Sequence, residues 1–359
     1  MVPYIIVYAL IFLSAFITKF YKPKKDLDAT ISFFLFAVLL LFIGLRHEVG
    51  GDWSSYMTWY QNIEKNGLDL SIKQVLTSDF GYNLANWFSA KLGFGIYGVN
   101  TICAFIFLIG LFKFSSLFGT QKYDGLLIAY PYLTMVVAMG YTRQAAAMGF
   151  VFMAYYKFLK KKYNSSYILS FLATFFHKSS LLILPFLMII SPKRRYLFTD
   201  IVLYSAVAVG LIGWAYQEIL ERFYKFYVES QMSSEGGLVR GLMNFIPAAG
   251  YILTGPLWKD KLKEEEKKFW FWTAVVVVIL VPLSFAKLTF ADRMLLYFSV
   301  IQIFFFVRVY DIFKEIQLKG MLYFSVIAVY TSSMVVWLFF AVHREAWIPY
   351  SNLIIELLR

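Results

Sequence analysis

The sequence predicts an all-α integral membrane protein, a single polytopic domain over residues 1–359 with about 11–12 transmembrane segments. Composition is the first indication: 60% of the residues are hydrophobic and 16% are charged, whereas soluble proteins average about 45–50% and about 25%. Apolar runs of about 17–22 residues also recur along the chain, which is the length a helix needs to cross a bilayer. The sequence lacks the alternating pattern of membrane barrel strands.

The predicted membrane segments follow one another with mostly short connections. The first, residues 3–20, is expected to be a retained helix and not a cleaved signal peptide, because no small-residue cleavage site follows it. The clear apolar spans are 3–20, 29–45, 96–118, 125–140, 143–159, 196–215, 239–257, 269–286, 291–310 and 320–342.

The stretch 164–190 is either one long helix or a hairpin of two short helices hinged at residues 177–180. The positive-inside rule favours the hairpin, because it places most of the 34 Lys and Arg residues in inner loops. A single helix would distribute them almost evenly and leave Lys178 in mid-span. With the hairpin, both termini are predicted to lie outside the cytoplasm.

The charge and cysteine content exclude several function classes. The net charge of +12 comes from lysines in short inner loops, which indicates anchoring at the cytoplasmic face and no nucleic-acid partner. The only cysteine, Cys103, lies in an apolar run, so no internal disulfide or thiolate metal site is possible. His47-Glu48 lacks the second histidine of a zinc-binding HExxH motif, and no cofactor or metal is predicted.

Two long loops are predicted on the outer, periplasmic side, at residues 46–95 and 216–238. The first loop contains two stretches with helical spacing of apolar residues. Their aromatic side chains are typical of the headgroup level, so both helices are expected to lie along the membrane surface. The apolar positions are Trp53, Tyr56, Met57, Tyr60 and Ile63 in one stretch, and Phe80, Leu84, Trp87, Phe88 and Leu92 in the other.

With this threading, charged residues from distant parts of the chain emerge on the outer face. A cation beside an apolar span costs free energy, about 2.5–3.5 kcal/mol at mid-bilayer, and such residues are usually kept for function. The sequence therefore predicts a functional site at this face. The converging residues are Arg46, His47, Glu48, Asp52, Arg143, His177, Asp292 and Arg293.

The motif RHEVGGDW at 46–53 has two interpretations. In the structural one, Asp52 is the N-cap of the helix starting at Trp53, the glycines form a turn, and Arg46 is a boundary anchor. In the functional one, Arg46 and Asp52 flank a site in which glycine backbone amides approach an anion.

The other three positions have similar alternatives. Small residues after Arg143-Gln144 would allow close helix packing, yet an arginine at a helix N-terminus also indicates an anion site. His177 is either a structural histidine or a group for proton transfer. Asp292-Arg293 is either a helix cap with an anchor or a further part of the binding site.

At these segments the chain resembles the EpsG-like branch of the Wzy-type polysaccharide polymerases. The matching pieces, in order, are GLRHEVGGDWSSYMTWY, YTRQAAAMGFVFMAYYKFLKKK, FLATFFHKSSLLILPF and ADRMLLYF. The resemblance implies a GT-C-like fold in the bacterial inner membrane, with the active site facing the periplasm. It also implies transfer of a growing O-antigen, capsule or exopolysaccharide glycan from undecaprenyl diphosphate onto the next lipid-linked repeat unit. A chain-length regulator and a flippase are the expected partners, beside the lipid-linked substrates and the bilayer.

The chemistry implied by this resemblance assigns a role to each site residue. Arginines fork to phosphate oxygens and stabilise the leaving diphosphate, which replaces a metal ion. Arg46, Arg143 and Arg293 are predicted to bind the diphosphates, together with His47, Gln144 and Asp292. His177 or Asp52 is the predicted base for the acceptor hydroxyl, and the sequence does not choose between them. An O-antigen ligase or a flippase for lipid-linked oligosaccharides is the alternative function.

Overall fold

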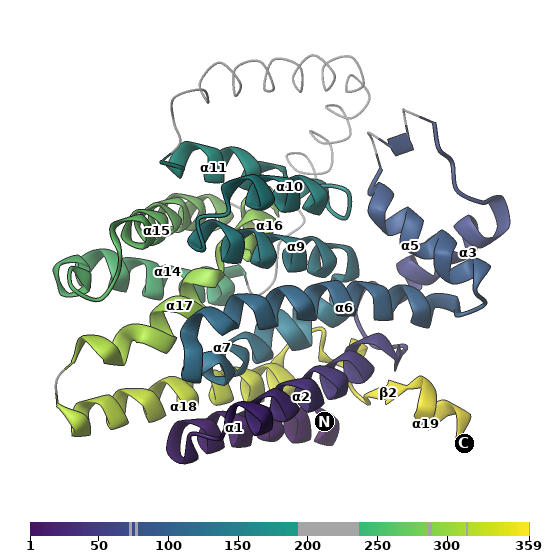
Figure 1. Ribbon diagram of the computed structural model, residues 1–359. Coiled ribbons are helices and arrows are strands. Elements are labelled where there is room, and N and C mark those ends of the chain that lie inside the picture. Colours follow the sequence, from purple (N-terminus) through teal and green to yellow (C-terminus); the bar gives the residue numbers. More distant parts are fainter. Residues whose placement is uncertain (72–73, 76–77, 193–236, 286–288, 314, 359) are drawn as a thin grey trace.

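The computed structural model of the chain is almost entirely helical (Figure 1). Six helical runs in its described part are long and apolar enough to cross a membrane. The predicted all-α membrane fold is therefore confirmed, whereas the number of 11–12 segments stays a prediction. The predicted span 196–215 and nearly all of the loop 216–238 lie outside the described residues. The described residues are 1–71, 74–75, 78–192, 237–285, 289–313 and 315–358.

The fold begins with two helices, α1 (Val2–Tyr21) and α2 (Lys25–Gly44). Lys22, with a φ of 43°, ends α1 and turns the chain back at once. Asp26 and Asp28 lie in the first turn of α2, where carboxylates complement the positive end of the helix dipole.

The next helical run, Gly95–Gly140, is 46 residues long and includes two predicted spans, 96–118 and 125–140. It folds back on itself near Gly119, whose φ of 61° breaks the helical path. The elements of the run are α6 (Gly95–Ser115), η1 (Ser116–Gln121), α7 (Lys122–Ala129), η2 (Tyr130–Val137) and α8 (Ala138–Gly140).

Helix α9 (Thr142–Leu159) packs closely against α6. A Cβ atom on Gly110 would lie 2.0 Å from the carbonyl oxygen of Gly149, and one on Gly149 would lie 2.3 Å from that of Ile106. The two backbones thus touch where both residues lack a side chain. The small residues of α9 serve the close packing that the sequence indicated.

The stretch 164–190 is a hinged pair of helices, as predicted. Helix α10 (Tyr163–Ala173) ends before a turn at residues 174–176, and the chain continues as η3 (Lys178–Leu182) and α11 (Ile183–Ile190). Helices α10 and α11 contact each other, so the segment folds back at His177.

The C-terminal half adds a second set of apolar helices, which contact α7 and α9 (Figure 1). Pro247 and Pro282 lie inside two of them. The elements are α14 (Gly237–Leu253), η5 (Gly255–Trp258), α15 (Glu264–Phe285), α16 (Thr289–Phe298), α17 (Val300–Arg308), η6 (Val309–Ile312) and α18 (Ile316–Phe340).

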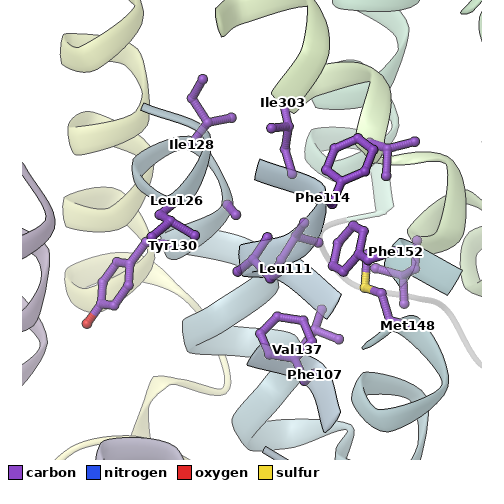
Figure 2. Close-up of a cluster of buried hydrophobic side chains, with 14 of the residues drawn as sticks. Phe107, Leu111, Phe114, Leu126, Ile128, Tyr130, Val137, Met148, Phe152 and Ile303 are labelled. Atoms are coloured by element: carbon purple, nitrogen blue, oxygen red, sulfur yellow. The ribbon is translucent and has the colours of Figure 1, made fainter. Parts of the chain in front are cut away.

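The main hydrophobic core lies between α6, α7, α9 and α17 (Figure 2). Phe114 stacks on Phe152, with ring centroids 5.6 Å apart. Phe107, Leu111 and Ile303 are fully buried beside them. Because helices in lipid gain little from the hydrophobic effect, such close contacts hold the bundle together.

Helices α3 (Trp53–Asn66) and α5 (Phe80–Lys91) lie at one end of this bundle (Figure 1). Both were predicted as amphipathic. On α5 the buried face carries the polar residues Asn83, Asn86 and Ser89 beside Tyr82 and Ala85, while Leu84 and Phe88 are 44% and 51% exposed. Leu84 and Phe88 thus form an exposed apolar surface away from the buried face, and the position of α5 along the membrane surface stays a prediction.

A C-terminal segment packs against the same end of the bundle. Strand β2 (Ser351–Asn352) pairs with β1 (Arg46–His47), with Arg46 opposite Asn352. The hydroxyl of Tyr4 donates to the carbonyl of Trp347, so the start of α1 lies beside this segment. Tyr4 and strand β2 thus lie close to Arg46, one of the predicted site residues. The remaining elements are η7 (Arg344–Ala346) and α19 (Leu353–Leu357).

Candidate functional site

A cluster of charged side chains lies where α3, α5, α9, η3, α14 and α16 begin. Its centre is Asp52, at the turn before α3. Gly50 makes this turn possible, because its φ is 111° and a Cβ atom there would lie 2.4 Å from the carbonyl of Met139. Its N–H donates to Ala346, so this amide holds the turn and does not reach toward a ligand.

The carboxylate of Asp52 faces two arginines. Asp52 is the N-cap residue of α3, as one interpretation of the motif predicts, but its side chain makes no capping hydrogen bond. Burial raises its pKa, and the nearby charges of Arg143 and Arg293 lower it, with a net increase. Asp52 is thus a half-buried carboxylate whose charged form is stabilised by these two arginines.

Arg143 is held at the N-terminus of α9 by groups from α3 and α5. Its Nη1 lies 2.6 Å from the carboxylate of Asp79, and its guanidinium lies 4.6 Å from the ring centroid of Trp59. Burial raises the pKa of Asp79, and the charges of Arg143 and Lys178 partly offset this. Asp79 was not predicted as a site residue, although it precedes a predicted amphipathic helix just as Asp52 does.

His177 lies at the fold of the helical hairpin, close to both arginines. Its Nδ1 accepts a hydrogen bond from the backbone N–H of Ser179 at 3.3 Å, and the hydroxyl of Ser179 lies 2.6 Å from the same nitrogen. That hydroxyl also lies 3.0 Å from the hydroxyl of Tyr297 on α16. Burial and the charges of Arg143 and Arg293 hold the pKa of His177 well below its usual range, so the ring is neutral.

The hairpin reaches the cluster because its turn packs on the start of α5. The N–H of Gly81 donates to the carbonyl of Phe175, and a Cβ atom on Gly81 would lie 2.8 Å from the ring of Phe176. This contact places Asp79, just before α5, near Lys178. The two predicted outer segments are therefore joined through backbone contacts.

Helices α14 and α16 contribute a second arginine–aspartate pair. Arg240 makes a two-point contact with Asp292, with distances of 3.2 and 3.0 Å. Gln144 donates to the backbone carbonyl of Arg293 at 3.1 Å and so joins α9 to α16. The sequence analysis did not select Arg240, although it is a cation at the start of a predicted span, as Arg143 and Arg293 are.

Arg46 lies behind the cluster and is 1% exposed. Its guanidinium donates to the carbonyls of Ile43 and Val49, to the side-chain oxygen of Asn100 and to the hydroxyl of Thr142. Four of its five N–H groups are therefore used by the protein itself. Burial lowers the pKa of Arg46 to about 10.

His47 contacts two aromatic side chains. Its Nδ1 lies 2.6 Å from the hydroxyl of Tyr97, and its ring also contacts that of Trp53. Of the residues predicted from the sequence, the structure thus brings together Asp52, Arg143, His177 and Arg293. Their role in substrate binding and catalysis stays a prediction.

The fold and the cluster define a polytopic α-helical membrane protein with an arginine-rich site where several helices begin. The chain belongs to the EpsG family, because the sequence model of this family matches residues 29–352. The predicted resemblance is thereby confirmed. Membership supports a role of the polysaccharide polymerase type, with glycosyltransferase-like chemistry at a membrane. No curated protein and no solved structure matches the chain.

Proposed function

We propose that this protein is a GT-C-type polysaccharide polymerase at the periplasmic face of a bacterial inner membrane. It transfers a growing glycan from undecaprenyl diphosphate onto the next lipid-linked repeat unit. The observation that carries the proposal is the convergence of Arg143 and Arg293 on Asp52 and His177. Around them the described residues add Arg240 and Lys178 against Asp79 and Asp292, so cations exceed carboxylates and an anionic ligand is favoured.

The arginines suit a diphosphate leaving group. In the reaction, the acceptor hydroxyl oxygen attacks the anomeric carbon while the bond from this carbon to the diphosphate oxygen breaks. The diphosphate leaves with the bonding electrons, and its growing negative charge is stabilised by Arg143 and Arg293. Arginine remains protonated and binds phosphate oxygens at two points, so the proposed mechanism requires no metal ion.

Asp52 is the better base for the acceptor proton. A backbone N–H can only donate, so Nδ1 of His177 accepts from Ser179, and in the neutral ring the proton lies on Nε2. This imidazole then offers a donor to the substrate, while its one available lone pair, on Nδ1, is engaged by the backbone N–H of Ser179. The Asp52 carboxylate, by contrast, makes no hydrogen bond within the described part of the chain and has a raised pKa, which suits a general base.

The other predicted site residues position these groups. Gln144 fixes the backbone of Arg293, and Asp292 holds the start of α14 through Arg240. Arg46 holds Thr142, next to Arg143, through a hydrogen bond of 2.7 Å. We therefore assign direct diphosphate contact to Arg143 and Arg293, and the assembly of the site to Arg46.

One incubation separates the candidate reactions. Purified protein in lipid nanodiscs is mixed with undecaprenyl-diphosphate-linked repeat units, with and without lipid A core, and the products are separated on a gel. A ladder of increasing lengths is expected for the polymerase. Single addition to lipid A would instead identify a ligase, and the absence of any covalent product would refute the proposed chemistry. Labelling of cysteines introduced at positions 52 and 143 in a Cys103→Ala background tests the periplasmic orientation.

A further inference from the structure

A groove of about 850 Å³ runs along α3, beside the charged cluster. The chain forms its second wall by turning back at Gly67, whose φ is 79° and whose N–H donates to the carbonyl of Ile63. Leu68 and Asp69 follow this turn and line the groove, and Asn83 of α5 closes it on a third side. The volume is within the range of sites that bind small organic ligands, about 300–1,000 Å³.

Most of the described residues that line this groove are polar, and few are charged. Among these described residues only Lys65 and Asp69 carry a charge, and their charges cancel. Carboxamides both donate and accept hydrogen bonds, and sugar hydroxyl groups require this combination. Among the described lining residues, five have carboxamides: Gln61, Asn62, Asn66, Gln74 and Asn83.

Trp59 connects the groove to the cluster. It lines the groove, while its ring lies over the guanidinium of Arg143 and its indole N–H donates to Asn83 at 2.8 Å. Ser55, which also lines the groove, is one helical turn after Asp52. From Ser55 to Asn66 the groove follows α3 for roughly 16 Å, at 1.5 Å per residue, which is longer than one sugar ring.

We propose that this groove, lined by Gln61, Asn62 and the other carboxamides, binds the uncharged glycan portion of a lipid-linked substrate. The inference rests on the proposed function, since it places the diphosphate at Arg143 and Arg293 and directs the sugars from there along α3. A neutral, carboxamide-lined groove beside a cationic cluster matches a ligand with an anionic end and a neutral chain of hydroxyl groups. Trp59, rigidly held between Asn83 and Arg143, forms the boundary between the two parts.

The test measures glycan binding apart from catalysis. Oligosaccharides without diphosphate, released by mild acid from the polymer of the host strain, are titrated by calorimetry into the full-length protein in nanodiscs. The double variant Gln61→Ala/Asn62→Ala should bind them about tenfold more weakly, because two exposed side chains lose their hydrogen bonds to sugars. Ser54→Ala, exposed on the same helix and outside the groove, serves as the matched control and should bind as the wild type does.

Binding by the double variant at wild-type affinity, or no binding by the wild-type protein, would overturn the groove assignment. Fragments of one repeat and of several repeats are titrated separately, so that the tighter ligand identifies the acceptor unit or the growing chain as the occupant. A parallel polymerisation assay with Asp52→Asn separates the two proposals. If Asp52→Asn loses polymer while the double variant binds fragments as the wild type does, the proposed glycan site in the groove is wrong and the proposed polymerase function still stands.

Discussion

Replacing Asp52 by asparagine tests the proposed base most directly. The amide has nearly the same size as the carboxylate but accepts no proton at neutral pH, so the transfer rate should fall about 100- to 10,000-fold. That loss corresponds to about 2.7–5.4 kcal/mol of transition-state stabilisation. The change breaks no hydrogen bond, because the Asp52 side chain makes none among the described residues and does not cap α3.

The same variant should not lose stability. Burial leaves the pKa of Asp52 above its usual value despite Arg143 and Arg293. A carboxyl whose pKa is raised on folding favours the folded state below its unfolded pKa, and this contribution is lost as the pH rises through the folded pKa. At neutral pH the ionised Asp52 therefore destabilises the protein slightly, and asparagine should leave the unfolding temperature unchanged or raise it.

The assay combines initial rates of glycan transfer in nanodiscs with thermal unfolding of the same preparations. Asp79→Asn is the matched control, because it replaces a carboxylate that is paired with Arg143 at 2.6 Å. The free energy of unfolding of this control should fall by about 1–3 kcal/mol. The loss is smaller than that expected on breaking a fully buried ion pair, because Arg143 is partly exposed. His177→Gln keeps a donor near the position of Nε2 and should retain more activity than Asp52→Asn. A wild-type rate in Asp52→Asn, or the larger loss in His177→Gln, would refute the assignment of the base.

Three further predictions follow from the geometry. Arg46→Lys should lower the free energy of unfolding by about 2–3 kcal/mol, because lysine cannot reproduce four hydrogen bonds in a buried site; unchanged thermal unfolding would contradict its structural role. Arg293→Gln removes a charge that lowers the pKa of Asp52, so the acidic limb of the pH–rate profile should move to higher pH, and a shift to lower pH would count against Asp52 as the titrating group. Gly149→Ala should lower the free energy of unfolding by about 1–3 kcal/mol, because the added Cβ atom would lie 2.3 Å from the carbonyl oxygen of Ile106. Denaturant titration of the purified protein measures this free energy.

Much of the fold was predictable because membrane helices are specified by long apolar runs. The distribution of basic residues favoured a hairpin hinged at residues 177–180 over one long helix, and the structure has a turn there. The C-terminal strand Ser351–Asn352 was not predicted, since two residues give no periodic signal and the pairing depends on a partner about 300 residues away. The polar inner face of α5 was also missed, because helical spacing identifies an apolar face without showing whether protein or lipid covers it.

The site was predictable in its members but not in their contacts. Cations at the ends of apolar spans identified Arg143 and Arg293, and the structure places both near Asp52 and His177. Asp79 and Arg240 gave the same kind of signal at two other helix starts. Their importance lies in pairs formed between distant segments, with Arg143 and with Asp292, and a single sequence does not reveal which charges are paired.

The sequence predicted the same role for Arg46, Arg143 and Arg293, but the surroundings of Arg46 indicate a structural role. Each follows or opens an apolar span, and Arg46 is 1% exposed and enclosed by carbonyl and side-chain acceptors of its own chain. These hydrogen bonds stabilise the fold, and a substrate could bind to this guanidinium only after some of them had broken. Arg46 is therefore better suited to a structural role than to ligand binding. Its bond to Thr142 lies beside Arg143 in the chain, so loss of Arg46 should disturb the position of Arg143 as well as stability. In the proposed mechanism, Arg143 would therefore depend on Arg46, as expected for a binding site whose donors are held in place before the ligand binds.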